Sequence, residues 1–298
     1  MGHRRGAGRG VAGGGGEAAL SMRLGMETAQ HRLEWPELVE QVRFGEEAGF
    51  DGAWIFDHFT PLYGEGPGPC LEAWTLLAGL GAATSRIRLG ALVTGATYRH
   101  PSLLATEAVT VDHISGGRLE LGLGAAWFEE EHRRLGFDFP GAGERVDRLE
   151  ETVAVLRLLM TTDHADFEGR HHRLSDATYR PRPVQRPHPP IWIGASGERR
   201  MLPLVGRVAD AWHCHASPEA LARKWAVVAE SAEAAGRDPG SIVRASNLSL
   251  SEPWDEVRRS AEAYRAAGVS YLVCSWPSEG RERMEEFVEA VMPEVAAA

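Results

Sequence analysis

The chain has 298 residues, of which 43% are hydrophobic and 25% are charged, and its formal net charge is −10. This acidic balance argues against a protein that binds nucleic acid through its phosphates, because such proteins are basic. No apolar run approaches the ~20 residues that span a bilayer, and three widely spaced cysteines without zinc-ligand spacing predict a reduced, cytoplasmic protein.

Residues 1–21 differ in composition from the rest of the chain. They are rich in glycine and arginine, so they cannot bury enough apolar surface to offset ordering entropy, and we expect a disordered tail. Arg4 and Arg5 could begin a twin-arginine export signal, but the glycines that follow are not the apolar segment such a signal needs. Translation could start at Met1 or at Met22, and we expect residues 22–298 to form one domain.

Apolar runs and helical patterns alternate along the rest of the chain. The runs predict strands at residues 23–29, 53–59, 87–94, 119–123, 191–193, 211–215, 241–250 and 271–276. The helical patterns that follow them cover residues 36–48, 71–83, 101–114, 145–160, 198–205, 218–235, 254–267 and 281–291. Because such strands pair in parallel through crossovers, eight units predict an α/β fold, a (β/α)8 TIM barrel rather than an open sheet.

Three longer segments interrupt this rhythm. Residues 61–70 and 128–143 follow the second and fourth strands, so they are insertions at the C-terminal, active-site face of the barrel. Residues 163–190, rich in proline, arginine and histidine, precede the fifth strand. We expect them to form a short hairpin and an extended strap that wraps mostly around the opposite face.

The residues that end each parallel strand face the substrate in a barrel. These positions hold Glu27, Thr28, Asp57, His58, Thr94, Gly124, Ala125, Trp127, the turn of residues 194–197, His213, His215, Asn247, Ser275 and Trp276. Asp57 and His58 form the sharpest pair, because an imidazole can act as acid, base or hydrogen-bond donor. The alternative for His58 is a core histidine that is satisfied by the backbone.

Two other strand ends have functional and structural interpretations. The small residues Gly194, Ala195, Ser196 and Gly197 follow a strand and open a helix, where backbone N–H groups can approach a phosphate, although a plain tight turn has the same sequence. His213 and His215 have the spacing of two metal ligands on one strand. No carboxylates are obviously placed to complete such a site, so we expect no metal.

Charged residues outside the strand ends favour structural roles. For Glu129, Glu130, Glu131 and His132, as for Glu144 and Arg145, helix-start electrostatics and salt bridges are favoured over catalysis. Arg180, Arg182, Arg186, Arg199 and Arg200 either form solvated surface or an anion-binding collar. Lys224, the only lysine, falls in a helical pattern, which excludes Schiff-base chemistry at a strand end.

The chain resembles the luciferase-like monooxygenase superfamily over about residues 22–298, and most closely its branch of coenzyme F420-dependent oxidoreductases. The segments that carry the resemblance are 54–59 (WIFDHF), 89–94 (LGALVT), 97–101 (TYRHP), 112–118 (DHISGGR), 122–132 (GLGAAWFEEEH), 181–185 (PRPVQ), 193–197 (IGASG) and 209–212 (ADAW). Each match is weak alone, but together they occur in order and in register with the expected barrel.

The resemblance implies a flavin or deazaflavin at the barrel mouth, backed by a non-prolyl cis peptide between Leu92 and Val93. It makes Asp57 and His58 catalytic residues at the reactive edge of the ring. The residues that would contact the cofactor are Asp57, His58, Leu92, Val93, Thr94, Gly124, Ala125, Gly194, Ala195, Ser196, Gly197 and Trp212. Trp127 aligns with the glutamate that serves some relatives as proton donor, so that role is not carried over, and Glu131 takes the family's usual acidic position.

The resemblance therefore predicts an F420-dependent oxidoreductase that transfers a hydride to or from a small organic substrate, with the arginine collar available for the cofactor's anionic tail. An FMN-dependent monooxygenase working with a separate reductase is the alternative. A metal-dependent hydrolase using His58, His213 and His215 is a third hypothesis, and a non-enzymatic cofactor-binding barrel a fourth. Family members are often dimers, so a homodimer is expected, with no nucleic-acid or membrane partner.

Overall fold

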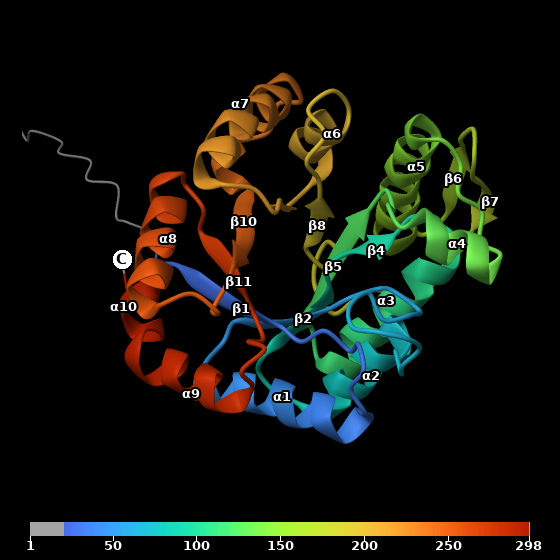
Figure 1. Ribbon diagram of the computed structural model, residues 1–298. Helices are drawn as coiled ribbons and strands as arrows, with labels where there is room; N and C mark the ends of the chain where they lie inside the picture. Colours follow the sequence, from blue (N-terminus) through green and yellow to red (C-terminus); the bar gives the residue numbers. More distant parts are fainter. Residues whose placement is uncertain (1–20, 298) are drawn as a thin grey trace, which may run out of the picture.

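The structure, a computed structural model, describes residues 21–297. The disordered tail expected for residues 1–21 lies outside the described residues, Ser21 apart, and so does Met1. In the described part, eight parallel strands close into a barrel that the helices surround (Figure 1). The predicted (β/α)8 TIM barrel is therefore confirmed.

The barrel closes through an unbroken ring of parallel pairings in the order β1-β2-β3-β5-β8-β9-β10-β11. Its strands are β1 (Arg23–Glu27), β2 (Gly52–Ile55), β3 (Arg88–Ala91), β5 (Leu119–Gly124), β8 (Ile191–Gly194), β9 (Ala211–His213), β10 (Val243–Leu248) and β11 (Tyr271–Ser275). The last strand returns to the first in the register Arg23 to Tyr271. All eight C-terminal strand ends therefore meet at one mouth.

A helix follows each barrel strand, as the sequence predicted. These helices are α1 (Trp35–Ala48), α2 (Ala73–Ala83), α3 (Pro101–Ser115), α5 (Ala142–Thr161), α6 (Met201–Val208), α7 (Pro218–Ala234), α8 (Trp254–Ala266) and α9 (Arg281–Ala290). Proline lies in the first turn of α1, α3 and α7, where its missing N–H costs no helical hydrogen bond. Gly49 ends α1 with a φ of 87°, which glycine adopts without strain.

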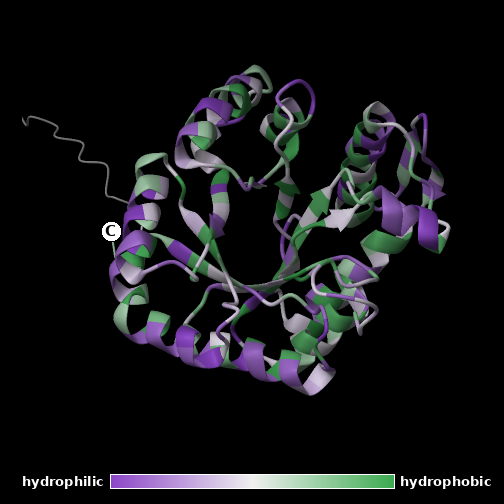
Figure 2. Cartoon of the chain, in the orientation of Figure 1, coloured by the Kyte–Doolittle hydropathy of each residue, from purple (hydrophilic) through white to green (hydrophobic). Residues whose placement is uncertain are grey.

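The apolar core has two parts. The larger part lies between the strands and the inward sides of the helices, whose outer faces are mostly hydrophilic (Figure 2). The smaller part is built from strand residues alone and fills the barrel interior, where the rings of Trp54 and Trp192 lie 4.6 Å apart and Trp54 donates a 3.0 Å hydrogen bond to the hydroxyl of Tyr271. These aromatic rings close the barrel centre, so any ligand must bind at an end.

The third predicted strand, residues 87–94, is divided. β3 ends at Ala91, the peptide bond between Leu92 and Val93 is cis as the resemblance implied, and the short strand β4 (Thr94–Gly95) pairs with β5. The carbonyl oxygen of Ala91 approaches so closely that a Cβ atom on Gly122 would lie 2.0 Å from it. The divided strand is therefore fitted against a glycine of its neighbour.

We expect Gly122→Ala to lower the free energy of unfolding by about 1–3 kcal/mol, the usual cost of overpacking a core. The atom in the way is backbone, so it cannot move aside as a side-chain tip could. Urea unfolding followed by circular dichroism measures the effect. Gly141→Ala is the matched control, because a Cβ there meets no atom within 4 Å, and equal stability of the two variants would contradict the prediction.

The insertions differ partly from expectation. The segment 128–143 contains an unpredicted helix, α4 (Glu129–Leu135). Two further short elements lie outside the insertions: a 3-10 turn at Pro239–Ser241, before β10, and helix α10 (Met292–Ala296), after α9. The hairpin predicted within 163–190 is present as β6 (Ala165–Glu168) and β7 (Arg173–Ala177). The strap also lies where expected, since Gln185 bonds to Arg88 and to the carbonyl of Leu119, where β3 and β5 begin.

Candidate active site

A cavity of about 560 Å³ opens at the C-terminal ends of the strands. Of the residues predicted to contact a cofactor, it is lined by Asp57, His58, Leu92, Val93, Gly124, Ala125, Gly194, Ala195, Ser196 and Gly197. The structure thus brings ten of the twelve together, from the ends of four strands (β2, β3, β5 and β8) that are far apart in the sequence.

Thr94 and Trp212 do not line this cavity. Thr94 is fully buried and accepts a 3.2 Å hydrogen bond from the indole of Trp74. Trp212 lies in the core, stacked 6.2 Å from Trp225 of α7, and its indole N–H donates a 2.9 Å hydrogen bond to the carbonyl of Ala195. Trp212 points away from the mouth because alternate residues of β9 face opposite sides of the barrel wall, and it supports the 194–197 turn from behind.

His58 is fixed by Glu131. Its Nδ1 lies 2.9 Å from Oε2 of this carboxylate, which also accepts a 2.7 Å hydrogen bond from the hydroxyl of Tyr98. The other carboxylate oxygen accepts 3.0 Å bonds from the backbone N–H groups of Phe59 and Thr60 and from the Thr60 hydroxyl. Because Nδ1–H donates to an anion, the neutral imidazole leaves its Nε2 lone pair free as a base or acceptor.

The protonation state of Glu131 suits this role. Burial alone would raise the pKa of Glu131, but the hydrogen bonds from His58 and Tyr98 and the charge of His58 lower it to about 2. Burial and the same carboxylate raise the pKa of Tyr98 above its usual range, so its hydroxyl remains a donor. Glu131 is therefore an anion at neutral pH.

The acidic cluster forms salt bridges, as the sequence favoured, but Glu130 and Glu131 do so in different environments. Glu130 does form an exposed salt bridge with Arg134, as helix-surface electrostatics predicts. Glu131 is buried instead, because α4 turns this residue toward the barrel mouth, and His132 beside it is buried against the ring of Tyr98 at 4.5 Å. Glu131 and Tyr98 both belong to segments that carried the family resemblance, which was the available signal for them.

A second charged network anchors Asp57. Its Oδ2 accepts a 2.7 Å hydrogen bond from Arg99, whose guanidinium also pairs with Glu72 and, at 3.2 Å, with Glu107. Burial raises the pKa of Asp57 while the Arg99 charge opposes this shift. Strand-end reasoning from the sequence did not single out Arg99, yet the consecutive residues Tyr98 and Arg99 bind Glu131 and Asp57, the two carboxylates beside His58.

Glu107 makes stability depend on pH. Burial raises its pKa from 4.5 to about 7, although Arg99 opposes the shift. A carboxyl group whose pKa is higher in the folded state than in the unfolded state stabilises the fold below the unfolded value, and this contribution disappears as the pH rises through the folded value. We expect Glu107→Gln to flatten the loss of stability between pH 4.5 and 7, measured by urea unfolding across this range, whereas an unchanged profile would contradict the assignment.

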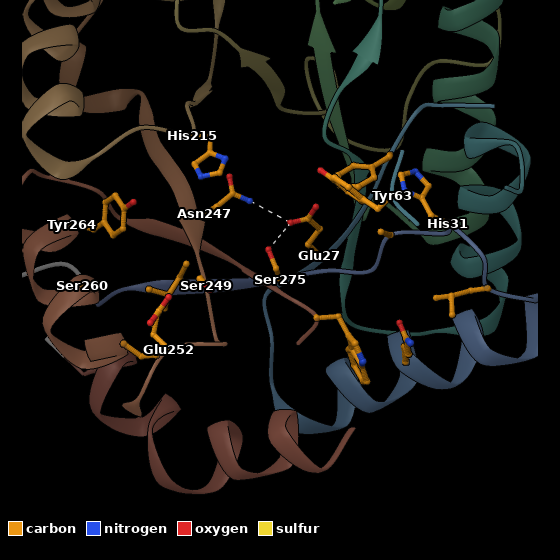
Figure 3. Close-up of a pocket in the computed structure, with 17 residues that line it drawn as sticks. Glu27, His31, Tyr63, His215, Asn247, Ser249, Glu252, Ser260, Tyr264 and Ser275 are labelled. Atoms are coloured by element: carbon orange, nitrogen blue, oxygen red, sulfur yellow. Dashed lines mark hydrogen bonds between the residues drawn. The ribbon is translucent and has the colours of Figure 1, made fainter. Parts of the chain in front are cut away.

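Glu27 stands where two cavities meet. It lines the cavity described above and also a neighbouring one of about 610 Å³ that extends toward α8 (Figure 3). Its Oε2 accepts hydrogen bonds of 2.9 Å from Ser275 and 3.3 Å from Asn247. Asn247 is in turn held by His213 at 2.8 Å, and burial raises the pKa of Glu27.

The 194–197 turn and its surroundings form a wall of small groups. Val93 packs between two glycines, since a Cβ on Gly124 would lie 2.6 Å from its side chain and one on Gly194 would lie 3.1 Å away. Among the described residues, the backbone N–H groups of Ser196 and Gly197 have no hydrogen-bond partner. Lys224 fixes the turn by donating a 2.6 Å bond to the carbonyl of Ser196. A flat ring fits the wall, and a phosphate fits the free N–H groups.

The predicted arginine collar is not one site. Arg180 and Arg182 pair with Asp163, and Arg186 follows Gln185 on the strap at the opposite end of the barrel. Only Arg199 and Arg200 adjoin the 194–197 turn, and Arg200 pairs with Asp147 at 2.5 Å. Strand β8 lies between the two groups of arginines and carries the chain from one end of the barrel to the other. Residues that are close in sequence are therefore far apart in the structure.

His58, His213 and His215 all line the cavity, as the hydrolase hypothesis required. However, the described residues contain no group of three or more His, Cys, Asp or Glu side chains that could hold a metal ion. His213 is hydrogen-bonded to Asn247, and burial lowers the pKa of His213 to about 4.

Within residues 21–297, no helix is long and apolar enough to cross a membrane.

Comparison with known proteins identifies the family. Residues 18–292 match the family model for luciferase-like monooxygenases, and the chain belongs to this family of enzymes. It is 31% identical over 244 residues to the F420-dependent glucose-6-phosphate dehydrogenase of Segniliparus rotundus, covering 79% of this chain and 71% of that enzyme. It is 33% identical over 171 residues to the FMNH2-dependent dimethylsulfone monooxygenase of Pseudomonas putida, covering 57% of this chain and 46% of that enzyme.

Solved structures agree with the fold. An F420-dependent secondary alcohol dehydrogenase, in complex with an F420–acetone adduct, superposes with a TM-score of 0.84 at 19% identity, covering 93% of this chain and 99% of that one. The coenzyme F420-dependent tetrahydromethanopterin reductase of Methanopyrus kandleri gives a TM-score of 0.79 at 19% identity, covering 92% and 99%. At these identities the likeness shows the shared barrel.

Proposed function

We propose that the chain is a deazaflavin (F420)-dependent oxidoreductase that transfers a hydride between the cofactor and a small organic substrate. The observation that carries the proposal is the arrangement of His58, fixed by the buried carboxylate of Glu131, opposite the small-residue wall around Val93 in one cavity. The F420-dependent glucose-6-phosphate dehydrogenase of Segniliparus rotundus supports it, because that match covers 79% of this chain.

The chain's own residues would divide the work. Val93, Gly124 and Gly194 would form the surface on which the ring lies, and the N–H groups of Ser196 and Gly197 would receive the cofactor phosphate. When bound, F420 supplies a carbon that accepts or donates a hydride as a two-electron carrier. His58 would exchange the accompanying proton at Nε2, while Glu131 keeps the imidazole in the required tautomer and orientation.

An FMN-dependent monooxygenase is the second candidate, because the Pseudomonas putida enzyme also matches this chain, over 57% of its length. A homodimer with a small-molecule substrate stays a prediction from the sequence. The two cofactor hypotheses differ in a direct measurement, since only one of the cofactors should bind tightly.

Parallel titrations with F420 and FMN, followed by the quenching of protein fluorescence, test the proposal. We expect F420 to bind with a micromolar Kd and FMN at least tenfold more weakly, and the reverse order would contradict the F420 assignment. Ser196→Asp should weaken binding at least tenfold by placing an anion beside the phosphate, whereas Ser196→Ala keeps the backbone donors and should bind as the parent does.

A further inference from the structure

The neighbouring cavity of about 610 Å³ is separate from the small-residue wall but continuous with the reactive region. It shares Glu27, Phe56, Tyr63, His215 and Asn247 with the cavity that holds His58. It extends from there between β10, β11 and α8, where Ser249, Glu252, Ser260 and Tyr264 line it (Figure 3). A molecule in this space reaches the same Glu27 that borders the proposed cofactor site.

Within residues 21–297, the lining of this space contains carboxyl groups but no lysine or arginine side chain. Among the described residues that line either cavity, none is lysine or arginine, whereas Glu27 and Glu252 carry carboxylates. Arg283 adjoins the rim, but it donates to the carbonyl groups of Leu250 and Glu252 and lies 3.5 Å from the centre of the Trp254 ring. Its guanidinium therefore binds the loop of residues 250–254 and does not line the cavity.

The buried histidine of this cavity adds no cation. His31 is 9% exposed, and burial lowers its pKa to about 4, so it is neutral at pH 7. Its Nδ1 accepts a 3.4 Å hydrogen bond from the backbone N–H of Leu62, which leaves the ring proton on Nε2. This Nε2 has no partner among the described residues. A buried, unpaired N–H group is costly, and a ligand oxygen would satisfy it.

Acceptors complete the pattern. Oε1 of Gln41, also in the lining, is buried and has no partner within residues 21–297. Oε2 of Glu27 accepts from Ser275 and Asn247, whereas no hydrogen bond within the described part of the chain involves its Oε1. One donor and two acceptors around a space that no described lysine or arginine lines match hydroxyl groups, which can both donate and accept, and disfavour carboxylates or phosphates, which at neutral pH mainly accept.

We propose that this cavity binds an uncharged, hydroxylated small molecule as the substrate and discriminates against alcohols that carry a phosphate or carboxylate. The inference rests on the proposed function. In the oxidising direction the substrate carbon would give its hydride to bound F420, and the hydroxyl would give its proton to His58, which lines the adjoining cavity; a carbonyl compound and reduced cofactor would result. In the reducing direction both transfers are reversed, so the same groups serve either way.

This substrate class differs from that of one similar enzyme. The relative from Segniliparus rotundus is named for glucose 6-phosphate, a dianion at neutral pH. Moving such an anion out of water without a compensating cation is strongly unfavourable, and Glu27 and Glu252 would add repulsion. The proposal therefore gives this chain a different substrate class from a relative with which it shares 31% identity.

Matched alcohols that differ in one anionic group test the inference. Oxidised F420 is incubated with the holoenzyme and glucose, glycerol, 1,2-propanediol, 2-propanol or cyclohexanol, and its reduction is followed by absorbance. Glucose 6-phosphate, glycerol 3-phosphate and lactate are the anionic partners of the first three. We expect at least one neutral alcohol to be oxidised with kcat/KM at least tenfold above that of any anionic partner.

A charge variant separates electrostatic discrimination from mere shape. Ser260→Lys places an ammonium group at the cavity, and it should raise kcat/KM for the anionic partners relative to the neutral alcohols by about threefold or more. Ala263→Lys is the matched control, because Ala263 lies on the same helix, is exposed and does not line the cavity. This control should leave the ratio unchanged.

Three results would overturn the inference: preference for an anionic partner, oxidation of no neutral alcohol in the panel, or an equal response of the two lysine variants. In each case F420 binding by the same preparation, measured by titration, shows that the proposed function still stands. A preparation that does not bind F420 contradicts the proposed function itself, and the substrate assignment falls with it.

Discussion

Glu131→Gln should lower kcat/KM for the hydride-transfer reaction by about 100-fold or more, while the Kd for the cofactor changes less than threefold. In the parent protein the carboxylate accepts a hydrogen bond from Nδ1–H of His58 and leaves Nε2 as a base. A glutamine can place its NH2 group toward Nδ1, which then becomes the acceptor and moves the ring proton to Nε2. Loss of a correctly protonated general base costs about 10² to 10⁴ in rate.

Single-turnover reduction of F420 measures the change separately from cofactor binding, and a pH profile adds a second readout. Glu130→Gln is the matched control, because Glu130 lies on the same helix but is exposed and pairs only with Arg134. That variant should retain the parent's rate. If Glu131→Gln also retained it, or if both variants lost activity equally, Glu131 would not position His58.

The sequence predicted the barrel because its signal is local and repeated. Each apolar run and each amphipathic pattern reports on its own segment, and parallel pairing follows from their alternation. The helix α4 was missed for a physical reason. Its seven residues, EEEHRRL, include six with ionisable side chains, so no apolar stripe reveals a helical period. Its fold depends on burying Glu131 and His132 against distant residues.

The site was predictable where it depends on strand ends and was missed where it depends on long-range contacts. His58 and the 194–197 turn follow strands, so barrel geometry alone places them at the mouth. Glu131 reaches His58 across 73 positions of sequence, and Arg99 reaches Asp57 across 42. Such pairings are set by tertiary packing, and hydropathy patterns carry no trace of them.

The two networks converge on one strand end. Tyr98 and Arg99 are neighbours in the chain, yet one binds Glu131 and the other binds Asp57. The backbone of residues 98–99 therefore connects Glu131, which orients His58, with Asp57, which precedes His58 in the sequence. A disturbance of Arg99 is expected to affect both the fold and the site.

Arg99→Met should lower the free energy of unfolding at pH 8 by about 3–5 kcal/mol, the usual cost of removing one partner of a buried ion pair. The Arg99 side chain is 7% exposed and that of Asp57 is 1% exposed, so water cannot replace the lost partner. Burial already raises the pKa of Asp57, and without Arg99 the shift grows. Urea unfolding of the parent and the variant at pH 5 and pH 8 measures both effects.

The pH dependence distinguishes this cause from simple loss of packing. A folded-state pKa raised above the unfolded value makes stability fall as pH rises, so Arg99→Met should be less destabilised at pH 5, where Asp57 can take up a proton, than at pH 8. Adding Asp57→Asn removes the unpaired charge and should recover part of the loss at pH 8, because a neutral amide costs less to bury than an ion. A destabilisation independent of pH and unrelieved by Asp57→Asn would instead assign Arg99 a packing role rather than an electrostatic one.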